Sequence, residues 1–467
     1  MEQAASDAVR ALRLSRPDAL DLAAEAGSLL LSNGAAAAEI VDIVMDICRA
    51  AGLPDVNVVV TYDQVTLALQ PDDSESEPYM RVAAVRSRSY NFGRYAATVE
   101  VVRRHLTGEL TARSALDEVR RLRSARLQPV WLTRLAAGVT GLAAGIVFGA
   151  SWTVALLALV AVLFSDWLGG ILAGRRWPGF FIQALVGALA VGVAVVGLRI
   201  DPEVDVSAVI IAVIIVALAG MTVTGAVQDA ITGWYLTGSV RVFESLIKSL
   251  GLVVGIKAAV MVADRLGVAG IVVYDFSTRA VRPVDMIVAA GVLVLAFGLT
   301  TQLPWRGVLA SAVIGMAGYA VYAAMLTGQA GPVWSAAVAA VVVGVTAALV
   351  ARRVRIPVSG LTNSAVLPLL PGVALFEALM ESTDYLFAGL DGLATAFSVA
   401  LTLATGMTLG GHLVAVVTRP WRSSADRLYV PYFSEPVATL RERDALDPAI
   451  ETPRARADEE PAKEARR

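Results

Sequence analysis

A block of 292 residues with few charges constrains the fold of this chain more than any other feature. Residues 129–420 carry 28 charged side chains, just under 10%, whereas soluble domains carry about 25%. The flanking segments, 1–128 and 421–467, carry 33 and 19 charges, about 26% and 40% of their residues. This distribution predicts a polytopic α-helical membrane protein with an N-terminal soluble domain and a polar C-terminal tail.

The low-charge block divides into apolar runs that are each near the ~20 residues needed to cross the hydrocarbon core of a bilayer. We count ten, at about 131–149, 152–173, 179–198, 206–220, 240–264, 284–300, 306–326, 332–351, 358–376 and 393–418. The segment from Met221 to Ser239 lies between the fourth and fifth runs and is neither clearly apolar nor charged. The prediction is therefore ten transmembrane helices in two five-helix halves, 129–264 and 265–420.

Residues 1–128 are predicted to form an α+β domain. Two helices are expected within 18–53, with Asp18 capping the first, and Thr111 is a plausible cap for the last helix. The other expected elements are strands at 56–62, 65–69 and 79–85 and helices at 92–107 and 111–126. We expect no signal peptide, because no apolar segment follows the start, and we expect residues 421–467 to be disordered.

The positions of the arginines predict the orientation in the membrane. With the N-terminal domain in the cytoplasm, the inside loops hold seven arginines and the outside loops hold four. The basic flanks at 120–134 and 419–427 also fall inside. The bias favours a multi-pass protein of the plasma (cytoplasmic) membrane with both termini in the cytoplasm.

Composition excludes several functional classes. A net charge of −2 without a concentrated basic face argues against nucleic-acid binding. One cysteine, Cys48, and two histidines, His105 and His412, make no zinc cluster. No Walker sequence is present, so coupling to ATP is not expected, and we predict neither a cofactor nor a metal.

The two halves carry related segments that indicate an internal repeat. In each, an interrupted apolar segment is followed by an acid, a glycine turn and a long apolar helix. Asp229 and Glu377 are 148 residues apart, and Gly238 and Gly389 are 151 apart. Because five is an odd number of spans, the halves would insert with opposite orientations, as in secondary transporters that build a site from interrupted helices.

Acidic and polar residues near these interruptions are the candidate site. Charged groups within a span are costly and usually face a cavity or a partner, so Asp229 and Glu377 are expected to handle protons or a substrate ammonium. Polar recognition is assigned to Gln228, Thr232 and Asn363. Glu244 can pair with Lys248 four residues later. We therefore consider two interpretations of Glu244, a structural ion pair and a role in transport.

Glycine and proline residues mark where the helices are expected to break. An interrupted helix exposes unpaired backbone groups that can bind a polar solute, and two prolines within a few positions cannot lie in a regular helix. The predicted helix-break residues are Gly220, Gly225, Pro368, Pro371 and Gly372.

These segments resemble the ThrE-type threonine/serine exporter family. The resemblance is carried by Gly220-Met221-Thr222, Gln228 to Gly233 and Arg241 to Glu244 in the first half, by Leu367 to Leu375 in the second, and by Leu29 to Ala35 with Gly52-Leu53 before the membrane block. It covers about residues 18–420 and implies ten spans, a cytoplasmic N-terminal domain and export of threonine and serine driven by the proton motive force. One departure is Ala219-Gly220, where a Pro-Gly turn is expected.

The resulting prediction is a secondary active exporter, not an enzyme, that works by alternating access and exchanges protons for a small amino acid. A passive channel or facilitator is the first alternative, and an intramembrane enzyme using paired acids is the second. The expected partners are the amino-acid substrate, protons and the lipid bilayer, and a homo-oligomer is left open.

Overall fold

The computed structural model describes residues 2–53, 56–69, 79–85, 88–147, 149–202, 204–217, 220–268, 283–372, 374, 378, 390–418 and 428–429. The elements before the membrane block are α1 (Glu2–Ser32), α2 (Ala37–Ala50), β1 (Val56–Val60), β2 (Gln64–Leu69), β3 (Tyr79–Ala84), α3 (Phe92–Leu106) and α4 (Ala112–Leu122). Those that follow are α5 (Val130–Val147), α6 (Trp152–Gly174), α7 (Gly179–Ile200), α8 (Val206–Ala217), α9 (Gly220–Ile231), α10 (Tyr235–Arg265), α11 (Pro283–Thr300), α12 (Trp305–Thr327), α13 (Pro332–Val354), α14 (Val358–Ala365), η1 (Leu367–Leu369) and α16 (Leu390–Thr418).

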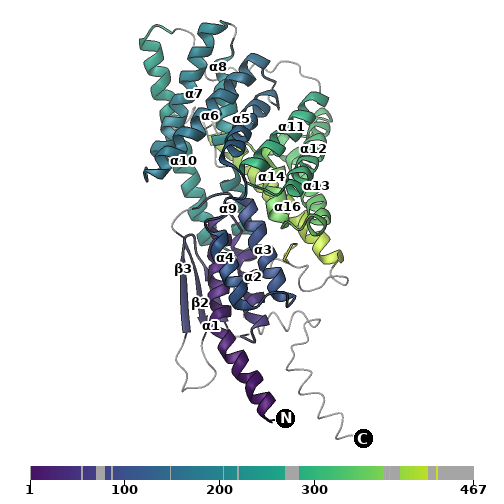
Figure 1. Ribbon diagram of the computed structural model, residues 1–467. Helices are drawn as coiled ribbons and strands as arrows, with labels where there is room; N and C mark the ends of the chain where they lie inside the picture. The colour runs from purple at the N-terminus through teal and green to yellow at the C-terminus, as the bar shows by residue number, and fades with distance from the viewer. Residues whose placement is uncertain are drawn as a thin grey trace.

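The elements before residue 123 pack together at one end of the molecule (Figure 1). The three strands form an antiparallel sheet in the order β1-β2-β3, with Val58 opposite Leu67 and Leu67 opposite Arg81. The sheet covers α1, and α3 and α4 pack beside α1 and α2. Thr111 caps α4 as predicted, because its hydroxyl accepts the amide of Ser114.

The prediction that Asp18 caps the first helix is wrong. Helix α1 continues through Pro17 from Glu2, so Asp18 lies within it and instead pairs with Arg113 of α4 at 3.1 Å. Leu428 and Tyr429 are the residues of the predicted C-terminal tail that the structure describes, and both are buried. The Tyr429 carbonyl accepts the amide of Val358 at 2.9 Å, and its hydroxyl bonds Glu100.

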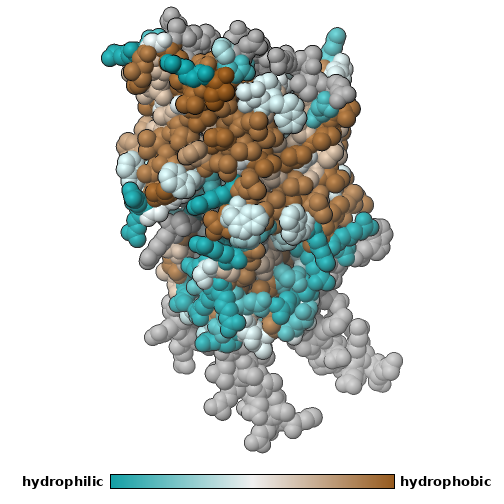
Figure 2. Space-filling model, turned by 45° about the horizontal axis from the view of Figure 1, so that its top comes forward, coloured by the Kyte–Doolittle hydropathy of each residue, from teal (hydrophilic) through white to brown (hydrophobic). Residues whose placement is uncertain are grey.

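Eight helices within the described residues are long and apolar enough to cross a membrane, namely α5, α6, α7, α10, α11, α12, α13 and α16. Their outward faces carry exposed leucine, valine, phenylalanine and tryptophan side chains, which form a broad apolar band above a hydrophilic end in Figure 2. The chain is therefore a polytopic helical membrane protein. The predicted fourth span, 206–220, corresponds to α8, and α9 begins at its last residue, Gly220. Helix α14 with η1 covers only part of the predicted ninth span.

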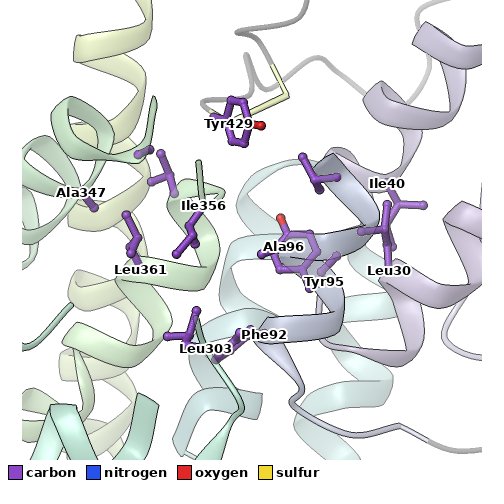
Figure 3. Close-up of a cluster of buried hydrophobic side chains, with 14 of the residues drawn as sticks. Leu30, Ile40, Phe92, Tyr95, Ala96, Leu303, Ala347, Ile356, Leu361 and Tyr429 are labelled. Carbon is purple, nitrogen blue, oxygen red and sulfur yellow. The ribbon is translucent and has the colours of Figure 1, made fainter. Parts of the chain in front are cut away.

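The buried core is continuous between the N-terminal elements and the membrane helices. Tyr95 and Phe92 of α3 lie between Leu30 and Ile40 on one side and Ile356 and Leu361 on the other (Figure 3). A hydrogen bond lies beside this junction, since the side-chain amide of Gln128, which follows α4, donates to the Leu303 carbonyl at 2.8 Å. We call α5 to α10 the first group of membrane helices and α11 to α16 the second group. The N-terminal elements are thus fixed against the second group.

Glycines set the closest helix contacts in the membrane block. A Cβ built on Gly255 of α10 would lie 1.8 Å from the carbonyl oxygen of Ala184 in α7. Gly255→Ala should therefore force α7 and α10 apart and lower the free energy of unfolding by at least about 2 kcal/mol, the range for overpacking. Gly170→Ala is the matched control, because a Cβ on Gly170, in α6, would meet nothing within 4 Å. Equal unfolding midpoints of the two variants in detergent would contradict this account.

Candidate functional site

A buried ion pair joins α9 to α10. Asp229 Oδ2 lies 2.8 Å from Arg241 Nη1, and the two residues are 0% and 4% exposed. The chain reverses between them at Gly233, whose φ of +88° is a left-handed conformation that suits glycine. Burial of both charges is tolerated because each offsets the desolvation of the other.

The start of α2 completes the coordination of this pair. The amide of Ala37 donates to Asp229 Oδ1 at 2.9 Å, and Arg241 Nη2 donates to the carbonyl of Ala35 at 3.0 Å. The residue at the N-cap of α2, Ala36, has no side chain that can bond these amides. Asp229 therefore supplies the cap, and its negative charge lies where the dipole of α2 is positive.

Two glycines allow α9 and α10 to approach. A Cβ on Gly238 would lie 2.7 Å from the carbonyl oxygen of Ala226, and one on Gly225 would lie 3.3 Å from Arg241 Nη1. The prediction that Gly225 breaks a helix is wrong, because Gly225 lies inside α9. Its lack of a side chain instead leaves room for the guanidinium group.

A second buried acid connects the N-terminal elements to the second group of membrane helices. Glu39, in the first turn of α2, accepts hydrogen bonds from the hydroxyls of Tyr95 in α3 and of Ser359 in α14, the latter at 3.0 Å. The two hydroxyl oxygens are 2.7 Å apart. Burial raises the pKa of Glu39 to about 7, and Asp42 adds to the rise while the two hydroxyls oppose it.

Further polar contacts join the N-terminal elements to α9 and α10. The hydroxyls of Tyr90 and Thr222 are 2.9 Å apart. Glu244 pairs with Lys248 at 2.7 Å and also bonds the hydroxyl of Tyr62, over whose ring the Arg88 guanidinium lies at 4.4 Å. Burial, together with the Glu244 carboxylate, raises the pKa of Tyr62 to about 12.

The structure brings some of the predicted site residues together and separates others. Asp229 contacts both Arg241 and the amide of Ala37. Gln228 precedes it in α9 and is half-buried. The Thr232 hydroxyl donates to the carbonyls of Gln228 and Asp229 and so closes the end of α9. Asn363 is buried in α14, one turn after Ser359. Glu377 lies outside the described residues.

The remaining predicted helix breaks lie at element boundaries. Gly220 is the first residue of α9, after α8 has ended at Ala217. Helix α14 ends at Ala365, Pro368 lies in η1, and Pro371 is in neither helix nor strand. Gly372 is helical, and its amide donates to the Leu370 carbonyl at 2.8 Å.

Sequence reasoning missed Glu39 as a site residue. It counted Arg241 among the loop arginines and among the residues that carry the family resemblance, but gave it no role in the site. The signal for Glu39 was a single acid in an otherwise apolar run, Ala35-Ala36-Ala37-Ala38-Glu39-Ile40. An isolated acid on an apolar helix face needs buried partners. No group of three or more histidine, cysteine, aspartate or glutamate side chains placed to hold a metal occurs among the residues that the structure describes.

Comparison with known proteins decides the family. The protein-family model described as "Putative threonine/serine exporter" matches residues 21–263. A second family model, described as "Threonine/Serine exporter, ThrE", matches residues 286–416. The chain belongs to the threonine/serine exporter family. A "Threonine/serine exporter" of Corynebacterium glutamicum is 28% identical to this exporter over 423 residues, covering 88% of this chain and 85% of the relative. A "Probable threonine/serine exporter" of Mycobacterium tuberculosis is 30% identical over 426 residues, covering 88% and 78%.

The family assignment confirms the resemblance seen in the sequence. The exporter is a multi-pass membrane transporter, and its relatives are named as exporters and not as enzymes. No solved structure matches the chain. The first family match ends within α10 and the second begins within α11. The boundary between the two matches therefore lies between the two groups of membrane helices.

Proposed function

We propose that this protein exports threonine, serine or similar small amino acids by secondary active transport, driven by the proton motive force through alternating access. The observation that carries the proposal is the buried Asp229–Arg241 pair, which joins two helices of a family named for this export. Buried ionisable groups in membrane helices usually serve a substrate or ion pathway. Threonine carries a positive and a negative group, and this pair offers one partner to each.

The proposed architecture is ten spans in two inverted repeats. Helices α8 and α9 together form the fourth span, and α14 begins the ninth. Support comes from glycine contacts that recur in both halves, between α7 and α10 and between α13 and α16. The glycines whose Cβ would meet the partner backbone correspond in pairs, Gly187 with Gly344, Gly251 with Gly406, and Gly255 with Gly410.

The backbone groups that these glycines contact correspond as well. Gly251 and Gly255 face the carbonyls of Phe180 and Ala184, and Gly406 and Gly410 face those of Ala337 and Val341. On α7 and α13 the matching residues are 157 positions apart, and on α10 and α16 they are 155 apart. Such a residue-for-residue match favours duplication, and five spans per half require opposite orientations.

We further propose that residues 1–128 form a cytoplasmic domain, that both termini are cytoplasmic, and that residues 129–264 and 265–420 are the two repeats. The polar end seen in Figure 2 and the arginine bias of the loops support this orientation. Asp229 and Glu377 are proposed to handle protons or the substrate ammonium. Gln228, Thr232, Asn363 and Glu244 are proposed to supply polar contacts along the path.

Asp229→Asn tests the central role of Asp229. Asparagine keeps the shape but has no charge for Arg241, for a proton or for an ammonium. We expect the variant, reconstituted in proteoliposomes, to lose at least about 90% of threonine flux driven by an imposed pH difference. Glu118→Gln, which removes an exposed carboxylate of α4, is the control and should transport as the wild type does.

Two results would contradict the proposal. Wild-type flux in Asp229→Asn would remove Asp229 from the mechanism. Flux through the unaltered protein that follows the threonine gradient equally with and without a pH difference would indicate a channel or facilitator.

A further inference from the structure

The Asp229–Arg241 pair contacts the backbone of α2 through two groups of opposite polarity. Asp229 accepts an N–H from Ala37, and Arg241 donates to the carbonyl oxygen of Ala35. The head of a free α-amino acid presents the same two functions, an ammonium that donates and a carboxylate that accepts. We propose that Asp229 and Arg241 bind the zwitterionic head of an α-amino acid, and that the start of α2 occupies this site as a plug.

Arg241 retains donor capacity that the backbone of α2 does not use. Its Nη1 faces Asp229 and its Nη2 bonds Ala35, while its buried Nε has no hydrogen-bond partner within the described part of the chain. The buried indole Nε1 of Trp234, which follows the turn between α9 and α10, also has none there. Buried donors are rarely left unpaired in proteins.

A carboxylate suits this edge of Arg241 better than a peptide carbonyl does. The Nε and Nη2 groups of a guanidinium form a planar fork that binds the two oxygens of a carboxylate together. A single carbonyl oxygen uses only Nη2. A substrate carboxylate would therefore satisfy one more buried donor than Ala35 does, and this difference favours displacement of α2 by an amino acid.

The same turn of α2 also connects the two groups of membrane helices. Ala35 and Ala37 hold the Asp229–Arg241 pair, whereas Glu39 is bonded to Ser359 of α14. Withdrawal of the plug would therefore release the site and separate α2 from α14 at the same time. The N-terminal elements act as a gate on the site, with the α2 start as the part that enters it.

This inference rests on the proposed export of amino acids, and a binding experiment separates the two. The full-length protein is purified in detergent, and binding of labelled L-threonine is competed with threoninamide, which lacks the carboxylate, and with N-acetylthreonine, which lacks the ammonium. The unaltered protein should prefer threonine over both analogues by at least tenfold. Arg241→Gln should lose the preference over threoninamide, and Asp229→Asn the preference over N-acetylthreonine.

Arg241→Lys keeps the charge beside Asp229 and so covers the case in which Arg241→Gln does not fold. Lysine lacks the planar fork, so the preference over threoninamide should fall at least threefold. If each folded variant keeps both preferences, the zwitterion site is wrong. Threonine flux into proteoliposomes, measured in parallel, tells whether export itself still stands.

Ala37→Pro tests the plug alone. Ala37 is the first residue of α2, a position where proline is well tolerated, and Ala36 before it has the extended backbone (ψ 149°) that proline requires. The substitution removes the amide hydrogen that Asp229 accepts, and the proline ring takes its place at a residue that is 0% exposed, so the start of α2 is pushed away from Asp229. Freed from its plug, the site should bind threonine at least threefold more tightly, because a larger fraction of molecules is competent.

Ala112→Pro is the matched control, since Ala112 is likewise the first residue of its helix, α4, after an extended N-cap. It should bind threonine as the unaltered protein does. Equal or weaker threonine binding by Ala37→Pro than by Ala112→Pro would overturn the plug.

Discussion

Arg241→Ala is expected to lower the free energy of unfolding by about 3–5 kcal/mol, because it leaves the Asp229 carboxylate buried without its cation. The double variant Asp229→Asn with Arg241→Gln should recover more than half of that loss, since two neutral amides carry no uncompensated charge. Unfolding of the purified protein by SDS in mixed micelles, followed by tryptophan fluorescence, measures both.

Arg104→Ala is the matched control for this prediction. Arg104 pairs with Glu118 at 3.0 Å, but both side chains are at least a third exposed. Its loss should cost no more than about 1 kcal/mol, the range for surface pairs. If Arg241→Ala and Arg104→Ala destabilise the protein equally, the buried pair has no special structural weight.

Glu39 is expected to make the stability depend on pH between about 4.5 and 7. Its pKa is about 7 in the folded protein and 4.5 in the ordinary reference, because the carboxyl group is buried. In this window the folded state holds a proton that the unfolded state has lost, so stability falls as pH rises. The shift corresponds to about 3 kcal/mol, fully present below pH 4.5 and lost above pH 7.

Glu39→Gln should remove this contribution. Glutamine resembles the protonated acid and keeps an oxygen that can accept from Tyr95 or Ser359. The difference in unfolding free energy between wild type and variant should therefore change by about 3 kcal/mol between pH 5 and pH 8, with the variant favoured at the higher pH. Parallel pH profiles for wild type and Glu39→Gln would refute the assignment.

Local patterns were enough to predict most of the fold. The runs of apolar residues predicted eight of the membrane helices, and the strand patterns at 56–62, 65–69 and 79–85 predicted all three strands, because both depend on neighbours in sequence. Helix ends were harder. Asp18 has the chemistry of a cap but lies inside α1, and Gly225 has the composition of a break but lies inside α9. In both cases packing, and not local preference, decides the conformation.

The candidate site was only half predictable. Asp229 was recognisable because an acid in an apolar segment is costly, but its partners were not. The Ala37 amide is 192 residues away in sequence, and Ser359 is 320 residues from Glu39. Contacts at such separations leave no periodic pattern, so neither Arg241 nor Glu39 was assigned to the site.

The cap that Asp229 provides for α2 has a consequence for synthesis. The amide of Ala37 leaves the ribosome 192 residues before the carboxylate that accepts it. At ~5–20 residues per second, this interval is roughly 10–40 s. Throughout it, the first turn of α2 has no side-chain cap of its own, because Ala36 offers none. The start of α2 can therefore form its final hydrogen bonds only after α9 has been synthesised. Folding of this early segment thus depends on membrane helices that are made later.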